Sequence, residues 1–179
     1  MRAVRGFSFV EVMTVIALMS IMMAITFVSF SGKRDETALN TSVREVAAAI
    51  RVAQSNALAG VREAGNDNAL CRHAAEATSA SSYAVLVRHL KPGNNLSSDC
   101  SLYPSKTTES SLGTFSLANG VTFASPTWRV DFGVPHGDVL GSTNQNVVLQ
   151  KSGKYSSVCV LASGSVLERP ASTTVPSCP

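Results

Sequence analysis

An uninterrupted apolar segment near the N-terminus constrains this chain more than any other feature. It covers residues 7–30 and contains one formal charge, Glu11. In helical form these 24 residues extend about 36 Å, enough to cross the roughly 30 Å hydrocarbon layer of a bilayer with some tilt. A single span in lipid must satisfy its own backbone hydrogen bonds, so the segment predicts a transmembrane α-helix.

The charge inside this segment needs a function and a partner. A carboxylate within a membrane helix costs a few kcal/mol or more. Phe7 and Glu11 are four residues apart and therefore share one helical face. If the chain is cut after Gly6, the new amine of Phe7 lies one turn from the Glu11 carboxylate. A secretory signal peptide has a shorter apolar core of about 7–15 residues, and a plain signal anchor leaves Glu11 unexplained.

The N-terminus resembles the class III signal of type IV prepilins and pseudopilins. The resemblance rests on a short basic leader, the sequence RGFSFVEV at residues 5–12 and the apolar run that follows. In that family a membrane aspartyl protease, the prepilin peptidase, cuts after the glycine and methylates the new first residue. The resemblance implies that Gly6 precedes the cut, that Phe7 becomes the N-methylated first residue, and that Glu11 acts in assembly. It covers about the first thirty residues.

The charge balance argues against a strongly basic protein. The chain has 179 residues and a formal net charge of +3. Arg2 and Arg5, both ahead of the expected cut, supply two of these three charges. The mature chain is therefore nearly neutral, which disfavours a basic nucleic-acid platform. Arginines in the leader also fit retention on the cytoplasmic side.

The four cysteines all follow the apolar run, at positions 71, 100, 159 and 178. An exported domain meets an oxidising compartment, where disulfides persist, so we expect two of them. Four cysteines allow three connectivities. Local pairing, Cys71 with Cys100 and Cys159 with Cys178, is favoured because each pair brackets its own segment.

No pattern indicates catalysis, a metal or a cofactor. The cysteines lack the close spacing of a zinc site, and the histidines at positions 73, 89 and 136 form no ligand ladder. The sequence contains no Gly-x-Ser-x-Gly nucleophile motif. Ser152-Gly153-Lys154 resembles the end of a phosphate-binding loop, but Tyr155 occupies the position of the Ser or Thr that binds magnesium. We therefore expect no enzyme activity.

Beyond the apolar run, the helical pattern continues as an amphipathic helix over residues 31–64. Its apolar positions recur at steps of three and four, which places them on one face: Leu39, Val43, Val46, Ile50, Ala53, Ala57 and Val61. A stripe of this kind needs a cover. After residue 65 the composition changes to Ser, Thr, Gly, Val and Asn, which indicates that the cover is a β-sheet.

The remaining residues, 65–179, predict a soluble β-rich domain. We expect loops at 66–81 and 91–111 and strands at 82–90, 113–117, 121–124, 128–132, 146–150, 156–161 and 165–168. Asn119-Gly120 is a tight-turn signal between two of these strands. The fold class is therefore α+β, with a long N-terminal helix packed on an antiparallel sheet. That architecture is similar to the pilin fold, and the strand pattern around residues 128–168 resembles FimT/GspH-type minor pilins.

These observations predict a structural minor subunit of a type IV pilus. Its expected partners are other pilin subunits, the prepilin peptidase, the inner-membrane assembly platform and membrane lipid. After loss of the leader, residues 1–6, the chain is expected to span the inner membrane once, with its soluble domain in the periplasm, before it enters the filament. A type II secretion pseudopilin is the first alternative. The second is a DNA-binding minor pilin for DNA uptake, with Lys151, Lys154 and Arg169 as candidate contacts; three dispersed cations form a weak patch, and a solvated edge explains them better.

Overall fold

The computed structural model describes residues 8–63, 68–94, 100, 105–141 and 143–179, with the side chains of residues 25–31 left out. It divides into two compact units, Met1–Thr37 and Ala38–Pro179. One helix, α1 (Phe9–Ala59), contributes residues to both. The strands all belong to the second unit: β1 (Leu70–Ala77), β2 (Ser82–Leu90), β3 (Thr107–Ser116), β4 (Thr122–Phe123), β5 (Arg129–Gly133), β6 (Gln145–Lys151), β7 (Lys154–Val160) and β8 (Val166–Ser172).

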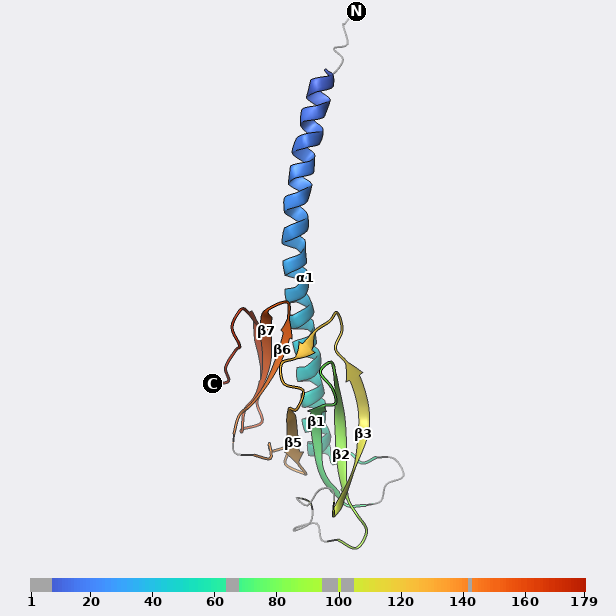
Figure 1. The fold of residues 1–179 in the computed structure, drawn as a ribbon. Helices are drawn as coiled ribbons and strands as arrows, with labels where there is room; N and C mark the ends of the chain where they lie inside the picture. The colour runs from blue at the N-terminus through green and yellow to red at the C-terminus, as the bar shows by residue number, and fades with distance from the viewer. Residues whose placement is uncertain (1–7, 64–67, 95–99, 101–104, 142) are drawn as a thin grey trace, which may run out of the picture. The chain divides into compact units, whose positions relative to one another are not determined.

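The strands form two antiparallel sheets beside the C-terminal part of α1 (Figure 1). One sheet has the order β3-β2-β1-β5 and the other β4-β6-β7-β8. The α+β fold class is confirmed. The strands divide between two sheets, however, where the sequence suggested one.

The core lies between α1 and the inner faces of both sheets. The apolar stripe of the helix is buried from Leu39 through Ile50 to Ala57. Phe132 and Val158 from the two sheets meet it in the same cluster. The stripe predicted from helical spacing is therefore correct as far as Ala57.

The helix ends earlier than the residue 64 predicted from the apolar stripe. Gly60 adopts a left-handed φ of 62°. Its N–H bonds the carbonyl of Ala57 at 3.3 Å, and the N–H of Val61 bonds the carbonyl of Asn56 at 3.0 Å. These two bonds form a Schellman motif, in which a left-handed glycine closes the helix. Val61 fits the stripe by spacing but lies beyond this cap.

The strand predicted at 82–90 is confirmed, but both predicted loops are wrong in part. The first, 66–81, contains β1 at the centre of its sheet, paired with β2 and β5. The second, 91–111, contains the beginning of β3. Alanine and charged residues in LCRHAAEA have weak strand propensity. Long-range pairing, not local preference, makes this segment a strand.

The predicted turn is present, but it does not join a hairpin. Asn119 and Gly120 have φ values of 58° and 70°, as a type I′ turn requires. The strands on either side nevertheless pair with other partners, β3 with β2 and β4 with β6. The turn thus carries the chain from one sheet to the other.

Aromatic rings connect the two sheets where the chain crosses. Tyr83 on β2 stacks on Phe115 of β3, with ring centroids 5.4 Å apart. It also meets Phe123 of β4 edge-on at 6.2 Å, and Phe123 meets Trp128 at 5.3 Å. Offset and edge-to-face pairs each add about 0.5–1.5 kcal/mol beyond their area burial.

Two disulfides tie the long connections to the sheets. Cys71 of β1 is bonded to Cys100, and Cys159 of β7 is bonded to Cys178 near the C-terminus. The Cα–Cα distances are 5.4 and 5.5 Å. These are the two local pairs expected from the sequence.

Candidate functional site: the N-terminal segment and the domain surfaces

The candidate assembly residue, Glu11, lies in the first turn of α1. Ser8 directly precedes the helix and accepts backbone hydrogen bonds from Glu11 at 3.0 Å and Val12 at 3.3 Å. Ser at the cap with Glu three residues later is the pattern of a capping box. The Glu11 side chain is exposed. Its position thus suits two roles, a helix cap or a charged contact with another chain, and experiment can separate them.

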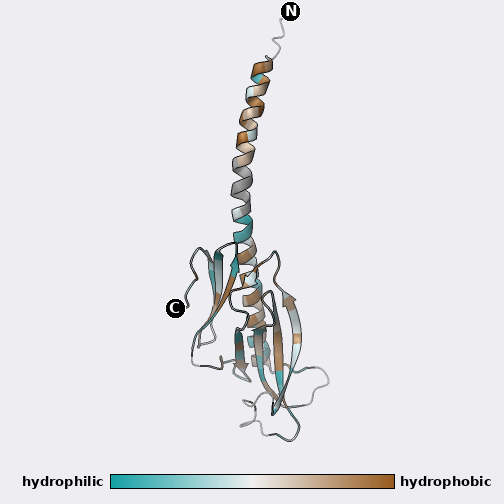
Figure 2. Ribbon diagram, in the orientation of Figure 1, coloured by the Kyte–Doolittle hydropathy of each residue, from teal (hydrophilic) through white to brown (hydrophobic). Residues whose placement is uncertain are grey.

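On both sides of Glu11 in the sequence, the helix exposes apolar side chains all around its axis. Eleven large ones between Phe9 and Met23 have exposed fractions between 45% and 74%. The N-terminal end of α1 is predominantly brown, or hydrophobic, in Figure 2. Its hydroxyls bond carbonyls of the helix itself, Thr14 to Glu11 at 2.9 Å and Ser20 to Ile16 at 2.8 Å. A helix that is apolar all round and internally bonded fits an apolar environment outside its own chain.

Gly6 and Phe7, the predicted cleavage and methylation residues, lie outside the described residues. Over the part of the chain that the structure describes, no helical stretch combines the length and the apolarity needed to cross a membrane.

Residues 1–27 match the family model of the prokaryotic N-terminal methylation motif. The motif supports a type IV pilin-like family for this chain. It implies processing by prepilin peptidase and association with other pilin subunits, in a family that is structural rather than catalytic. No curated protein and no solved structure matches the chain.

The three cations considered for DNA lie in the second sheet. Lys151 ends β6 and pairs with Lys154, which begins β7. Arg169 on β8 pairs with Ser157, three residues along β7 from Lys154. All three are half-buried, and both lysines have interaction partners. The geometry therefore places them in one sheet without making an exposed basic ridge.

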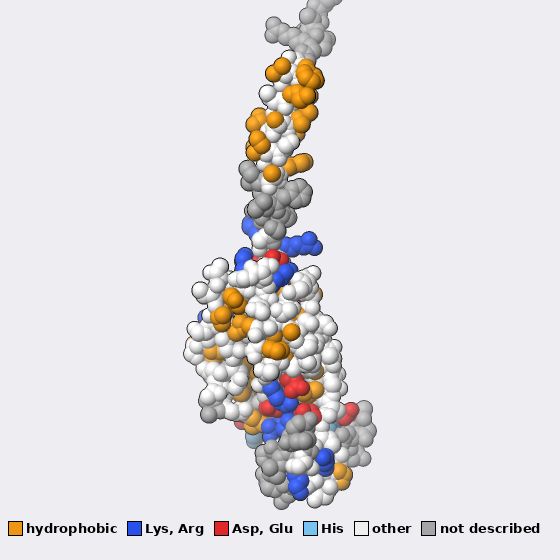
Figure 3. All heavy atoms as spheres, viewed as in Figure 1, with side chains coloured by type: hydrophobic (Ala, Val, Ile, Leu, Met, Phe, Trp, Pro, Cys, Tyr) orange, Lys and Arg blue, Asp and Glu red, His pale blue; other side chains and the backbone are white. Residues whose placement is uncertain are grey.

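A partly buried ion network lies on the outer face of the first sheet, and sequence reasoning missed it. Its centre is Arg129, which donates to Glu76 at 2.7 Å, to Asp131 at 3.0 Å and to Glu109. Arg88 also donates to Glu109, at 3.2 Å. The Glu109 side chain is only 9% exposed. Figure 3 shows basic and acidic side chains gathered on the part of the molecule where β1 and β5 lie.

The network balances its charges and is anchored to a disulfide loop. Arg72 approaches Asp131 at 3.9 Å and donates to the carbonyl of Cys100 at 3.0 Å. Burial lowers the pKa of Arg72, which Asp131 partly offsets. Burial also opposes the charge of Arg129, but its bonds to Glu109 and Asp131 outweigh this and raise the pKa of Arg129. Because these charges are paired and hydrogen-bonded to one another, we assign them a structural role in the domain.

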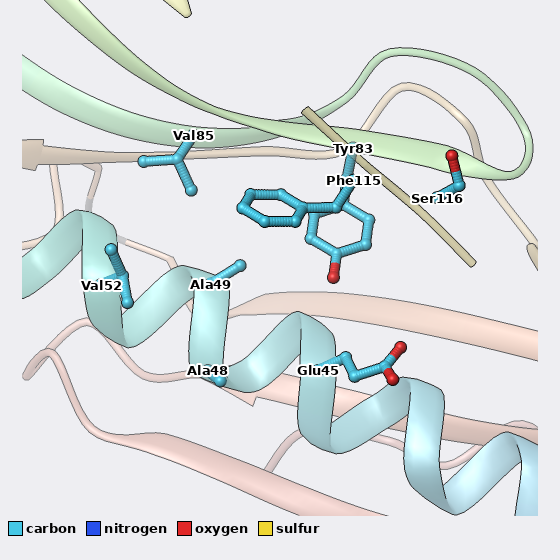
Figure 4. Close-up of a pocket in the computed structure, with 8 residues that line it drawn as sticks. All are labelled: Glu45, Ala48, Ala49, Val52, Tyr83, Val85, Phe115 and Ser116. Carbon is cyan, nitrogen blue, oxygen red and sulfur yellow. The ribbon is translucent and has the colours of Figure 1, made fainter. Parts of the chain in front are cut away.

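An apolar hollow of about 490 Å³ lies between α1 and strands β2 and β3. Figure 4 shows Ala49 and Val52 of the helix on one side and Val85 and Phe115 of the sheet on the other. Val52 and Phe115 are about half exposed. Apart from Glu45, Tyr83 and Ser116, the residues that line the hollow are apolar. The hollow could therefore contact an apolar partner, but its lining contains no catalytic arrangement of side chains.

At the rim of this hollow, the Tyr83 hydroxyl points toward the helix that carries Glu45 (Figure 4). Burial, and secondarily the Glu45 carboxylate, raise the pKa of Tyr83. Elsewhere in the described residues, no group of three or more His, Cys, Asp or Glu side chains is arranged to hold a metal ion. His73 and His89 are buried in the domain, and His136 is exposed in a turn.

Proposed function

We propose that the protein is a minor structural subunit of a type IV pilus. It is made as a precursor, cut between Gly6 and Phe7, N-methylated on Phe7, and held in the inner membrane by a single span over residues 7–30 with its domain in the periplasm. The observation that carries this proposal is the match of residues 1–27 to the methylation motif, within which the helix exposes its apolar side chains on all sides.

Assembly in this proposal depends on charge. Lipid is as apolar as a neighbouring helix, so burial of apolar surface gives a membrane helix little reason to leave it. An ion pair between Glu11 of one subunit and the Phe7 amine of its neighbour removes two costly membrane charges. Apolar helices then pack along the filament axis, while the β-rich domains with their disulfides face outward. The assignment as a minor subunit rests on the resemblance to FimT/GspH-type proteins.

Processing is checked by the intact mass of protein from producing cells. The proposal expects a chain that begins at Phe7 and carries one additional methyl group. A chain that begins at Met1, or one cut beyond Phe30, contradicts it.

A series at Glu11 separates the charged contact from the helix cap. Glu11→Asp keeps the charge, Glu11→Gln keeps a hydrogen-bond acceptor without it, and Glu11→Ala removes both. If the charge pair drives assembly, Gln and Ala both reduce incorporation into sheared filaments by about tenfold or more, since even 1.4 kcal/mol is a factor of ten. Asp retains most of it. If Glu11 only caps the helix, Gln behaves like the wild type.

Two measurements keep this series interpretable. Carbonate extraction should show that every variant inserts at least as well as the wild type, because Asp keeps the carboxylate and its loss in Gln and Ala only lowers the cost of insertion. Ser20→Ala, which changes another polar residue of the same exposed stretch, should assemble normally. Equal incorporation of wild type and Glu11→Ala refutes the charge-pair mechanism.

Two other roles use the same scaffold. A minor pseudopilin of type II secretion has the same processing and the same helix, and deletion of the gene should then impair protein secretion while surface pili persist. A DNA-uptake pilin should bind duplex DNA at about 150 mM salt with micromolar affinity or better. Charge reversal at Lys151, Lys154 and Arg169 together should abolish that binding. We expect weak binding that disappears with salt, because released counterions drive it.

A further inference from the structure

Polar side chains of α1 bond the free edge of the second sheet. Strand β8 is the outermost strand of its sheet, so one row of its backbone groups has no neighbouring strand. Asn40 accepts a hydrogen bond from the N–H of Ala171 at 3.2 Å. About three helical turns further on, Arg51 donates to the carbonyl of Val166 at 3.2 Å and to the carboxylate of Glu168 at 2.9 Å. Helix and strand thus form a seam that is bonded at both ends.

Between these two contacts the seam opens into a pocket of about 240 Å³. Its lining comes from α1 and β8: Asn40, Val43, Arg44, Glu168, Arg169 and Pro170. Arg44 precedes Arg51 by two helical turns and so lies on the same side of the helix. The volume is several times the roughly 30 Å³ that one water occupies in the liquid, so the pocket has room for a small polyatomic ion.

The arginines of this pocket exceed its carboxylates. Among the described residues, Glu168 is paired with Arg51, whereas the guanidinium groups of Arg44 and Arg169 have no hydrogen bond or ion pair. The Nε of Arg169 is buried without an acceptor. A buried donor left unpaired costs about 1–3 kcal/mol, and more where the group is charged. With Arg51 from the neighbouring contact included, this seam carries three guanidinium groups and one carboxylate, so its net charge is positive.

We propose that this pocket binds a tetrahedral oxyanion, a phosphate group held between Arg44 of α1 and Arg169 of β8. The planar fork of a guanidinium presents parallel N–H donors that match phosphate oxygens. Two forks from two elements would hold the anion from both sides and neutralise the local excess of positive charge. The phosphate can come from a soluble phosphate compound or from a phospholipid headgroup. A pocket that admits one such group does not provide the row of contacts that duplex DNA requires. The proposal does not depend on the role in a filament.

The test uses the full chain in detergent, with the single tryptophan, Trp128, as the probe of unfolding. Inorganic phosphate is titrated against chloride at constant ionic strength, and the unfolding midpoint is recorded. A ligand that binds only the folded state raises the midpoint in proportion to ln(1 + [L]/Kd). Arg44→Gln and Arg169→Gln should each weaken the apparent phosphate affinity by about tenfold, the effect of losing one charge-assisted contact.

Two further variants make the test specific. Arg62→Gln removes an exposed cation outside the pocket and should leave the phosphate response unchanged. Glu168→Gln removes the negative charge that competes with the anion and should strengthen phosphate binding. If Arg44 and Arg169 act only in the fold, their variants shift the midpoint equally with and without phosphate, which overturns the proposal.

The same variants in nanodiscs distinguish the two sources of phosphate. Replacing part of the phosphatidylcholine with phosphatidylglycerol should raise the midpoint through Arg44 and Arg169 if the ligand is a lipid headgroup. A response to inorganic phosphate alone assigns the pocket to a soluble compound. Two results overturn the proposal: no response in either arm, or arginine-dependent binding of duplex DNA without any phosphate response.

Discussion

The first and second parts of α1 carry similar apolar side chains, but their surroundings differ. Between Phe9 and Met23 these side chains are exposed, Ile16 by 56%. From Leu39 to Ala57 they lie in the core of the domain, and Ile50 is fully buried. The covered part is amphipathic and meets two sheets of its own chain. The part between Phe9 and Met23 is exposed on all sides; the proposed function places it in lipid or against other subunits.

The largest expected effect comes from placing the same charge in each part. Ile50→Asp puts an unpaired carboxylate into the core and should cost more than about 4–5 kcal/mol, enough to unfold the domain. Ile16→Asp should leave the unfolding midpoint of the domain unchanged and instead reduce membrane insertion, at a cost of about 2.5–3.5 kcal/mol. Thermal unfolding followed by Trp128 fluorescence checks the first variant, and carbonate extraction the second.

Isosteric controls separate charge from shape. Ile50→Asn and Ile16→Asn change volume as the aspartates do but remain neutral, so each should show a smaller effect than its charged counterpart. If Ile16→Asp lowers the midpoint of the domain as much as Ile50→Asp, the two parts of α1 do not differ in the way that their exposure indicates.

The features that were predictable from the sequence are those with a local signal. Helical spacing placed Ile50 and Ala57 on the buried stripe because the period of 3.6 residues fixes a face. The alternation of Tyr83, Val85 and Val87 predicted the strand that the structure shows as β2. The early end of the helix also had a local signal, Gly60, whose left-handed conformation closes it. The prediction extended the helix to residue 64 because the apolar spacing continues past this glycine to Val61.

The features that the sequence concealed depend on distant partners. In the ion network, Glu76 and Arg129 are 53 residues apart, and no pattern relates them before β1 and β5 pair. The same holds for Gln54, which donates to the carbonyls of Gly137 and Gly164 at 3.4 and 3.2 Å. Gly137 has a φ of 68°, and a Cβ there would lie 2.7 Å from Leu58. Such a close approach is known only once helix and loop are in place.

Within the domain, the same comparison can be made between a nearly buried carboxylate and an exposed one. Glu109 accepts hydrogen bonds from Arg88 and Arg129 and is nearly buried, whereas Glu168 pairs with the exposed Arg51. Glu109→Gln should cost about 3–5 kcal/mol because it removes the nearly buried carboxylate that Arg88 and Arg129 share. Glu168→Gln should cost about 0–1 kcal/mol. Chemical denaturation of both variants in phosphate-free buffer measures the difference, and equal costs would show that the network is solvated.

The smallest effect concerns histidines and pH. His73 is fully buried, and its Nε2 lies 3.0 Å from the carbonyl of Val61. Burial lowers the pKa of His73, and the neighbouring His89 acts in the same direction. The unfolded chain then binds a proton more readily than the folded domain, so stability is lost as the pH falls below about 6.5. The loss is at most about 1.4 kcal/mol per pH unit, and it levels off below the pKa of the folded state.

Substitution isolates this contribution from the carboxylates that also titrate in acid. His73→Gln removes the titrating group while its amide can still donate to the carbonyl of Val61. Between pH 7.5 and 5, the free energy of unfolding of the variant should fall less steeply than that of the wild type. His136→Gln, at an exposed turn, should follow the wild-type curve because an exposed imidazole meets water in both states. If the curves of wild type and His73→Gln run parallel, the proton that destabilises the domain binds elsewhere, and burial of this ring does not set its response to acid.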